Sequence, residues 1–466
     1  MTRIALGSLL AILGLTACSL MNLPDPALEL SIPAQWPTAA LEENPEDEDK
    51  LPEWREFYGH AGLADLIAIA LENNRDLRLA ASRVRKAAAL AGVAESNRWP
   101  GIQGNLSLSA SRTPGDLNSN KQVSLTHRLD TGLTLSSFEI DLWGRLASLD
   151  AAEEARFLAS EEALRAVRVV LIASVAEAFV SWREAVERVE LSTALVANRE
   201  SSLNLTRRRG GEGLASRRQV TEAEVALESA RADLAEAVRI RESARNALEL
   251  LLTRPDGLAE TWPPLRDIDL DRPLSADLPS GLLLKRPDIV AAEKKLQGAN
   301  GDVAAARANY LPRIALTASG GTASHALDGL FAAGSGAWSF LPSVTLPIFD
   351  IKRKQQEEMA AAAERDGLLA SYEKAVQQGF REVAESLAVQ KSIRQRKHSL
   401  HEALLSREEQ LSLTGKRLKA GLDGKAELLE SERAVLLARS QALAAEKQAI
   451  SARIQLYKVL GGGGNP

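Results

Sequence analysis

The only cysteine in the sequence, Cys18, stands where a lipid could be attached. Arg3 gives a short basic start, and residues 4–16 form an apolar stretch that is too short to span a bilayer stably. The stretch ends in Leu15-Thr16-Ala17-Cys18, the pattern of a lipobox, in which small residues precede a cysteine whose thiol receives a diacylglyceryl group. We predict that Cys18 becomes the mature N-terminus and carries several acyl chains, which together form a stable anchor.

The residue after the cysteine indicates the destination. Ser19 is not the aspartate that is associated with retention in the inner membrane, so sorting to the outer membrane is expected. The alternative is an ordinary signal peptide with an incidental cysteine. Nothing later in the chain supplies an unbroken apolar run of about 20 residues, so no transmembrane helix is expected.

Other side chains with possible chemistry are few. His398 and His401 are three residues apart on a predicted helix and could in principle hold a metal, but no carboxylate accompanies them in a suitable pattern, and we interpret them as solvated. The sequence lacks G-x-x-x-x-G-K-[ST], G-x-S-x-G and H-E-x-x-H. Three methionines are too few for a methionine relay for copper. We predict no catalytic residue, no metal and no cofactor, and a protein that is not an enzyme.

The composition favours closely packed helices. Aromatic residues make up only 4% of the 466 residues, whereas a large globular core usually buries more rings. Packing of helices through small side chains is therefore expected. The formal charge of −5 argues against a nucleic-acid partner, which usually leaves a basic footprint.

The sequence contains a tandem duplication. A shift of 208 residues aligns one pair of stretches at identical residues, and a shift of 212 residues aligns a pair farther upstream. The matched pairs include Arg199/Arg407, Glu200/Glu408, Gly213/Gly421, Leu214/Leu422, Glu224/Glu432 and Arg231/Arg439, and upstream Asp76/Asp288, Asn97/Asn309 and Pro100/Pro312. The two halves, at about 60–255 and 280–462, therefore predict two copies of one structural unit.

Each half predicts a helix (about 61–98 and 287–309), two β-like segments, a very long helix, a glycine-marked turn and a further helix. No proline interrupts 150–209 or 354–420, which gives helices of about 60 and 67 residues, roughly 90–100 Å long. Helices of this length need a partner throughout. The turns at 210–213 and 420–421 return the chain antiparallel, which predicts two coiled-coil hairpins.

The β-like segments predict membrane strands. Trp338, Phe340, Val344 and Leu346 are apolar at alternate positions of 338–348, with polar residues between them, so they are the expected lipid-facing side chains. The other strands are expected at about 102–112, 128–140 and 314–322, lengths that suit a tilted membrane strand. Four strands cannot close a barrel, and lipid does not tolerate an open edge, so several chains must share one barrel.

The predicted domains follow from these features. The signal peptide comprises 1–17, the lipid-anchored extended arm 18–60, the first repeat 61–255, a proline-rich equatorial linker 256–285, the second repeat 286–462 and a flexible tail 463–466.

Four motifs resemble those of a known family. They are Leu284-Lys285-Arg286-Pro287-Asp288-Ile289 with Ala291-Ala292-Glu293, then residues 139–145, 346–350 and 456–463. The chain resembles TolC-type outer-membrane efflux proteins, in the OprM/NodT-like lipoprotein branch that serves RND-type tripartite systems. The resemblance implies a mainly α-helical homotrimer with a shared twelve-stranded β-barrel in the outer membrane and a periplasmic α-barrel of twelve helices.

The resemblance also implies two functional sites. The family's hairpin tips dock a periplasmic adaptor, and the matching residues here are Gly213, Leu214, Ser216, Gly421 and Leu422. A leucine beside a glycine can seat on a partner hairpin because glycine permits close backbone approach. The alternative is a helix C-cap with its usual hydrophobic contact.

The second implied site is a periplasmic gate. The family carries an Asp and an Arg just past the second tip, and Glu430 and Arg433 occupy those positions in the run 428–433. The replacement of Asp by Glu, and Ala426 in place of a bulkier apolar residue, alter the expected gate geometry. The alternative is an ordinary i, i+3 surface pair within one helix.

The function that these features predict is passive conduction. An inner-membrane pump, expected to be of the RND type, would supply energy, an adaptor would bridge the periplasm, and this trimer would carry small toxic molecules outward. The alternatives are a coiled-coil lipoprotein that tethers the outer membrane and a type I protein-secretion duct; an outer-membrane enzyme is the weakest option.

Overall fold

The computed structural model describes residues 51–119, 121–254, 262–268 and 280–462. Cys18, the predicted signal peptide and the tail 463–466 lie outside the described residues. The described chain divides into a strand unit, comprising Arg83–Glu161 and Ala291–Glu373, and a hairpin unit, comprising residues 51–82, 162–290 and 374–462. Across the described helices, no segment is both long and apolar enough to cross a membrane.

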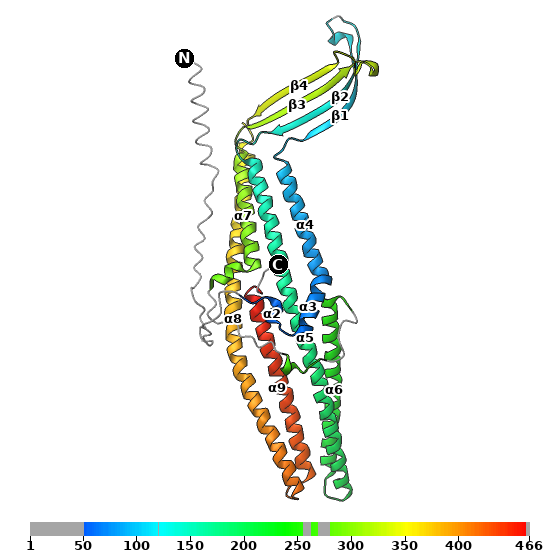
Figure 1. The fold of residues 1–466 in the computed structure, drawn as a ribbon, viewed down its shortest axis with the longest axis vertical. Coiled ribbons are helices and arrows are strands. Elements are labelled where there is room, and N and C mark those ends of the chain that lie inside the picture. The colour runs from blue at the N-terminus through cyan, green and yellow to red at the C-terminus, as the bar shows by residue number, and fades with distance from the viewer. Residues whose placement is uncertain (1–50, 120, 255–261, 269–279, 463–466) are drawn as a thin grey trace. The chain divides into compact units, whose positions relative to one another are not determined.

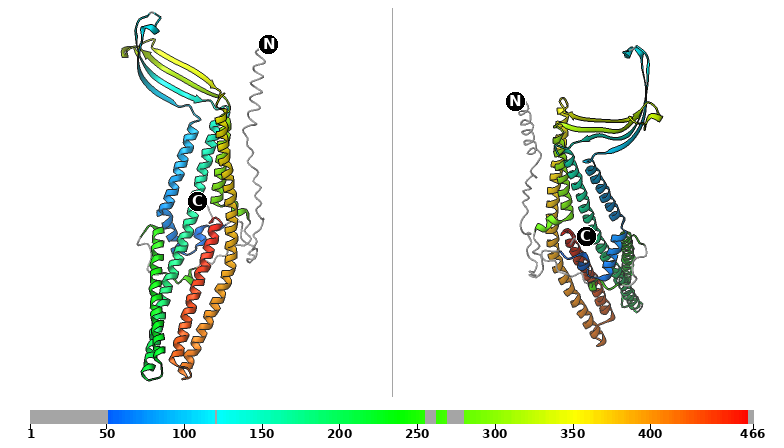
Figure 2. Two further views of the ribbon diagram at one scale, coloured as in Figure 1. Left: turned by 180° about the vertical axis from the view of Figure 1, so that it is seen from behind. Right: turned by 45° about the horizontal axis from the view of Figure 1, so that its top comes forward.

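The strand unit contains one antiparallel sheet of four strands in the order β1-β2-β3-β4 (Figures 1 and 2). The strands are β1 (Ile102–Thr113), β2 (Ser124–Glu139), β3 (Arg313–Ser324) and β4 (Gly336–Thr345). The prediction of four strands is confirmed, although β2 begins four residues before the predicted start. β4 ends at Thr345 and not at 348, because Thr345 pairs with Arg313, the first residue of β3, and β3 offers no partner beyond it. Leu346 therefore lies beyond the strand, which corrects its assignment as a strand residue.

The sheet has one apolar and one polar face. Trp338 pairs with Gly320, Phe340 with Ala318 and Val344 with Ile314, so all of these residues share a face. The other face carries a Ser319–Ser339 hydroxyl bond of 2.7 Å and a 3.0 Å bond from Thr134 Oγ1 to Asn105 Oδ1. The alternation in the sequence thus becomes a sheet that can face lipid on one side and water on the other.

A pair of glycines lets two central strands approach closely. Gly132 of β2 is directly opposite Gly321 of β3. A Cβ added to Gly132 would lie 2.4 Å from the Gly320 carbonyl oxygen, and one added to Gly321 would lie 2.1 Å from the Thr131 carbonyl oxygen. Neither position accepts a side chain without moving the backbone of its neighbour.

The helices are α2 (Trp54–Phe57), α3 (Ala61–Asn73), α4 (Arg75–Ser96), α5 (Arg145–Gly211), α6 (Arg217–Leu252), α7 (Pro287–Ala308), α8 (Ile351–Lys419) and α9 (Lys425–Val459). Short 3₁₀ turns occur at Gly115–Leu117, Leu265–Asp267, Ser280–Lys285 and Leu327–Gly329. The two longest helices, α5 and α8, have 67 and 69 residues. The expectation of two very long uninterrupted helices is confirmed.

The first predicted helix, 61–98, is in fact two helices. Asn74 separates α3 from α4 in an extended conformation. Its side-chain oxygen accepts hydrogen bonds from the backbone N–H of Asp76 (2.9 Å) and of Leu77 (3.1 Å), which caps the start of α4. The single long helix was wrong here because an asparagine side chain competes with the helical backbone bonds.

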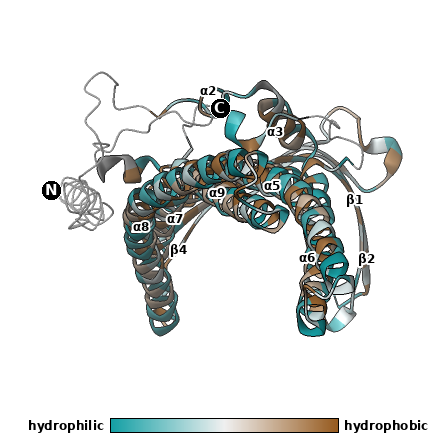
Figure 3. Ribbon diagram, turned by 90° about the horizontal axis from the view of Figure 1, so that it is seen from below, coloured by the Kyte–Doolittle hydropathy of each residue, from teal (hydrophilic) through white to brown (hydrophobic). Residues whose placement is uncertain are grey.

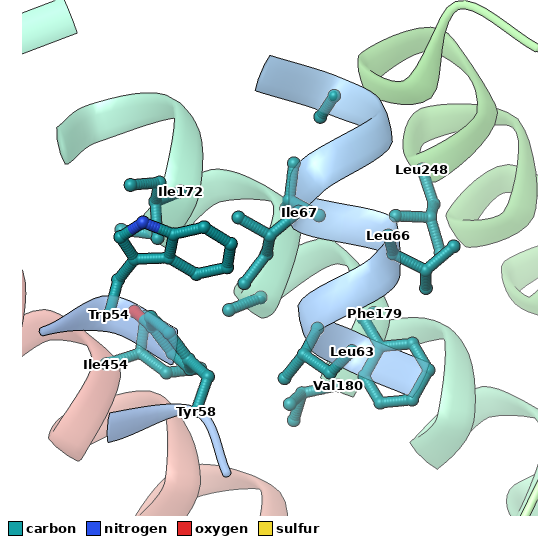
Figure 4. Close-up of a cluster of buried hydrophobic side chains, with 14 of the residues drawn as sticks. Trp54, Tyr58, Leu63, Leu66, Ile67, Ile172, Phe179, Val180, Leu248 and Ile454 are labelled. Carbon is teal, nitrogen blue, oxygen red and sulfur yellow. The ribbon is translucent and has the colours of Figure 1, made fainter. Parts of the chain in front are cut away.

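The hairpin unit contains the main hydrophobic core. Figure 4 shows Trp54 and Tyr58 from the α2 segment, Ile67 from α3, and Phe179 and Val180 from α5 converging with side chains of α6 and α9. Phe57 stacks on Tyr457 with ring centroids 4.0 Å apart. The predicted extended arm, 18–60, is therefore wrong at its end, because residues 54–57 are helical and Trp54, Phe57 and Tyr58 are buried in the core.

Within the hairpin unit, α6, α5, α9 and α8 follow one another in a curved row (Figure 3). Each neighbouring pair has its own polar link: Arg231 of α6 with Glu200 of α5 at 2.8 Å, Asn198 of α5 with Leu429 of α9 at 2.9 Å, and Arg439 of α9 with Glu408 of α8 at 2.8 Å. α5 and α6 form the first hairpin, and α8 and α9 form the second.

The duplication in the sequence is repeated in the contacts. The pairs Arg231–Glu200 and Arg439–Glu408 are separated by the same shift of 208 residues. In the strand unit, Arg98 pairs with Asp150 at 2.7 Å, and Tyr310 bonds Glu358 at 3.1 Å at the equivalent positions. Polar ties therefore recur at equivalent positions of the two repeats, even where the residue types differ.

Candidate functional sites

The tip of the first hairpin is a helix cap with an exposed leucine. Gly213 has a φ of 75°, which favours glycine, and its N–H bonds the Gly210 carbonyl at 3.1 Å. The Leu214 N–H bonds the Arg209 carbonyl at 2.7 Å, which completes a Schellman-type end to α5. Leu214 remains 64% exposed, so the hydrophobic contact that usually accompanies such a cap is largely missing. Ser216 then caps α6 in a capping box with Gln219.

The tip of the second hairpin repeats this geometry. Gly421 has a φ of 72°, the Leu422 N–H bonds the Arg417 carbonyl at 2.9 Å, and Leu422 is 67% exposed. Arg417 also forms a bidentate pair with Asp423, at 2.8 and 2.9 Å. The structure thus places the five predicted tip residues in two matching caps, each of which presents a leucine to solvent.

The charge at the first tip differs from that at the second. Arg208, Arg209, Arg217 and Arg218 are all exposed, and the first turn of α6 contains no acidic residue. Cations at a helix N-terminus are disfavoured by the helix dipole, so Arg217 and Arg218 interact unfavourably with the dipole of α6. The second hairpin has Glu427 at the equivalent place in α9. All four arginines lie within six residues of Leu214 in the sequence, and their exposure was not predicted from it.

The predicted gate residues form an ion pair on α9. Arg433 Nε donates to Glu430 Oε2 at 2.9 Å, and a second guanidinium nitrogen contacts Glu430 Oε1. The hydrogen bond from Arg433 holds the pKa of the Glu430 carboxyl below its ordinary value and raises the pKa of Arg433. Burial lowers the pKa of Arg199 on α5, and the positive charge of Arg433 lowers it further. Arg199 therefore lies within electrostatic reach of the Glu430–Arg433 pair, which the sequence alone did not indicate.

The family-like motif at 284–289 has a structural role in the hairpin unit. The Arg286 guanidinium, 8% exposed as a residue, bonds Asp288 at 2.8 Å, Glu382 of α8 at 3.0 Å and the Val459 carbonyl of α9 at 2.8 Å. Arg286 thereby holds the start of α7 to both helices of the second hairpin. Burial raises the pKa of Asp288, but the hydrogen bond and charge of Arg286, together with backbone N–H donors, outweigh burial and lower the pKa below its ordinary value.

The remaining predicted residues belong to the sheet and to α8. Trp338, Phe340 and Val344 are exposed on the apolar face of the sheet. His398 and His401 are exposed on α8. Among the residues that the structure describes, no group of three or more His, Cys, Asp or Glu side chains could hold a metal ion.

Comparison with known proteins gives consistent matches over nearly the whole chain. The family model of the outer membrane efflux protein matches residues 66–254 and 278–462. The chain is 36% identical to outer membrane protein OprJ of Pseudomonas aeruginosa over 98% of this chain and 95% of the relative. It is 37% identical to the toluene efflux pump outer membrane protein TtgF of Pseudomonas putida over 88% of this chain and 85% of the relative. The open state of the Neisseria gonorrhoeae MtrE outer membrane channel matches with a TM-score of 0.82 at 34% identity, over 93% of this chain and 96% of that chain.

A four-stranded sheet with one apolar face, joined to two duplicated helical hairpins, defines the TolC-like class of outer-membrane channels. The chain belongs to the outer membrane efflux protein family and is a channel subunit of an efflux system in the outer membrane. The resemblance that the sequence motifs indicated is thereby confirmed.

Proposed function

We propose that three copies of this chain form a passive conduit through which a tripartite system exports small toxic molecules. The four-stranded sheet is the observation that supports this proposal most directly. It is the only sheet among the described residues, and β1 and β4 each have one edge without a partner strand. Lipid does not tolerate unpaired backbone groups, so strands from other copies must complete the sheet. Three copies give the twelve strands that the family resemblance implies.

The expected cargo is small, and the chain acts without catalysis. Relatives are described as solvent, toluene and antibiotic efflux pump outer membrane proteins. The polar face of the sheet, with Asn105, Thr134 and Ser319, suits a water-filled passage. Energy would come from an inner-membrane pump, which we expect to be of the RND type.

Lipid at Cys18 is the proposed anchor to the outer membrane. Cys18 lies outside the described residues, so this proposal is supported by the lipobox in the sequence. Metabolic labelling with a fatty acid should mark the wild-type chain and leave a Cys18→Ser variant unlabelled. Labelling of the variant would contradict acylation at Cys18.

The hairpin tips are the proposed docking surface for the adaptor. Both tips present an exposed leucine beside a glycine of positive φ. Four exposed arginines lie within six residues of Leu214 in the sequence, against one exposed acidic residue, Glu212, so we expect that the partner surface there is acidic and that docking weakens with salt.

Glu430 and Arg433 are the proposed periplasmic gate. Three copies of the pair around a narrow axis would place like charges close together, and pairing between opposite charges would relieve the repulsion. Arg199, which lies within electrostatic reach of both residues, is part of the proposed gate. Opening then requires the second hairpin to move, and adaptor contacts would favour the open population.

The decisive test is single-channel conductance in planar bilayers. Wild type is compared with a Glu430→Ala/Arg433→Ala variant and with Glu236→Ala/Arg239→Ala, a bidentate i, i+3 pair of the same geometry on α6. A small wild-type conductance that rises only in the first variant is expected. Large conductance in all three proteins would support the conduit and show that the gate lies elsewhere. No conductance from folded, inserted protein would overturn the conduit in favour of a tethering lipoprotein.

A further inference from the structure

The apolar face that carries Phe340 can be followed across the sheet to β1. Phe340 of β4 is paired with Ala318 of β3. Ala318 is paired with Leu135 of β2, and Leu135 with Ile102 of β1. Residues paired directly across antiparallel strands share a face, and every second residue of a strand lies on that face. The apolar row of β1 is therefore Ile102, Gly104, Leu106, Leu108, Ala110 and Arg112.

The one charged residue of this row is at the end of β1 that is farther from the helices. β1 begins at Ile102, soon after α4 ends, and Arg112 is ten positions farther along the strand. Ten residues of strand extend about 33 Å. At a strand tilt of roughly 40° this distance spans about 25 Å of height, which is the height of the apolar band of outer-membrane barrels. The row therefore changes from apolar to cationic where the apolar band should end.

Two histidines accompany Arg112. His127 of β2 is opposite Ala110, so it is a diagonal neighbour of Arg112 on the same face, at a Cβ distance of roughly 7–8 Å. His325, which follows β3, donates from Nδ1 to the His127 carbonyl at 2.8 Å, so this ring is held beside His127. All three side chains are exposed. The far end of the apolar face thus gathers hydrogen-bond donors around one fixed positive charge.

The polar face pairs its cation with an anion, whereas the apolar face does not. Arg128 follows His127 on β2 and belongs to the polar face, where its Nε donates to both carboxylate oxygens of Asp130, at 2.8 and 3.0 Å. Within the described part of the chain, the Arg112 side chain has no ion pair and no hydrogen bond. The segment between β1 and β2 contributes one exposed charge of each sign, Asp116 and Lys121. The charge of Arg112 therefore remains for a partner outside this chain.

We propose that Arg112, with His127 and His325, binds the phosphate of a lipid in the outer leaflet of the membrane. The proposal rests on the proposed conduit, because a shared barrel puts the far ends of the strands at the outer surface. A guanidinium binds a phosphate through two parallel N–H···O bonds, and the imidazoles add further donors. The acyl chains of the same lipid would lie along Leu106 and Leu108, which are 71% and 70% exposed. One lipid molecule would thus cover both the charge and the apolar surface beside it.

Titration of the full chain in neutral detergent with lipid A tests this site, and lipid A without its phosphates is the reference. Wild type should bind the phosphorylated lipid more tightly. Arg112→Gln should weaken that binding roughly fivefold, the effect of one cation near anionic lipid, and leave binding of the reference lipid unchanged. Arg112→Lys, which keeps the charge and lacks the fork, should lose less. Arg128→Gln, which removes the same charge from the polar face, should behave as wild type.

Equal affinity of wild type for the two lipids, or an unchanged preference in Arg112→Gln, would overturn the lipid site. Displacement of the phosphorylated lipid by an equal concentration of inorganic phosphate would also overturn it, because the site would then recognise the ion alone. Conductance in planar bilayers separates these outcomes from a failure of the conduit. A conducting wild type without lipid preference removes only the lipid site, whereas absence of current from inserted wild type removes the conduit on which the site depends. Wild-type conductance in Arg112→Gln would show that its loss of binding does not come from misfolding.

Discussion

The two hairpins correspond to the two copies of one duplicated unit, and they share some contacts of that unit and differ in others. Both keep the glycine cap with its exposed leucine and the Arg–Glu tie between their two helices. Both also keep a side chain, Gln219 or Glu427, that accepts a hydrogen bond from the backbone N–H at the start of the return helix. They differ where one hairpin meets the other and where charge gathers at the tips. The shared contacts therefore build the frame, and the differences mark the positions at which the halves took separate roles.

The largest effect on the free energy of unfolding is expected at the equivalent positions 74 and 286, which carry different residues in the two repeats. Asn74 donates to the Leu251 carbonyl at 3.3 Å, and its counterpart Arg286 donates to the Val459 carbonyl. Arg286→Ala leaves two carboxylates without their partner and should lower the free energy of unfolding by about 3 kcal/mol. Asn74→Ala removes a helix cap and should lower it by about 1 kcal/mol. Chemical denaturation of the detergent-solubilised protein measures both; equal losses would contradict the different roles.

The next largest effect should appear in adaptor binding. Arg217→Gln/Arg218→Gln reduces the charge of the first tip without altering the cap, and should weaken binding and flatten its salt dependence. The matched variant at the second tip, Lys419→Gln/Lys425→Gln, should change binding less, because acidic residues already accompany its cations. Titration of an immobilised cognate adaptor at several salt concentrations measures the difference. If the variant of the second tip weakened adaptor binding more than the variant of the first tip, the main electrostatic contact would belong to the second tip.

A smaller effect concerns pH. Arg433 lowers the pKa of Glu430 in the folded protein, so the pair contributes stability above the ordinary glutamate pKa, and that contribution is lost as pH falls through the lowered value. Conductance should therefore rise when the pH is lowered below about 4. Glu430→Gln should remove this component, whereas Glu222→Gln, at the equivalent position of the first hairpin, should keep it. A pH response that survives Glu430→Gln would place the titrating group elsewhere.

The smallest effects should be equal in the two hairpins. Arg231 and Arg439 are half-exposed partners of Glu200 and Glu408, and exposed ion pairs add little to stability. Arg231→Ala and Arg439→Ala should each shift the thermal midpoint only slightly and by the same amount. A clearly larger shift for one of them would show that the tie has gained a separate role in that repeat.

The absence of proline over long stretches was sufficient to predict the long helices, and alternation together with segment composition was sufficient to predict the four strands. Local sequence pattern was not sufficient everywhere. It failed at Asn74 and at residues 54–57, where one side-chain cap and a few aromatic contacts outweigh the local pattern. The gate and tip residues came from family resemblance. Asn198 could not be predicted, because a polar residue on a long helix gives no sign of which helix it will meet.

The unpaired edges of β1 and β4 have a consequence for the order of assembly. If one chain cannot place its sheet in lipid alone, insertion has to follow or accompany the meeting of copies, and its rate must rise steeply with the concentration of chains waiting in the periplasm. During that wait both edges are templates for wrong pairing. An early lipid anchor would shorten the wait, because it confines the search of the chains for one another to a surface.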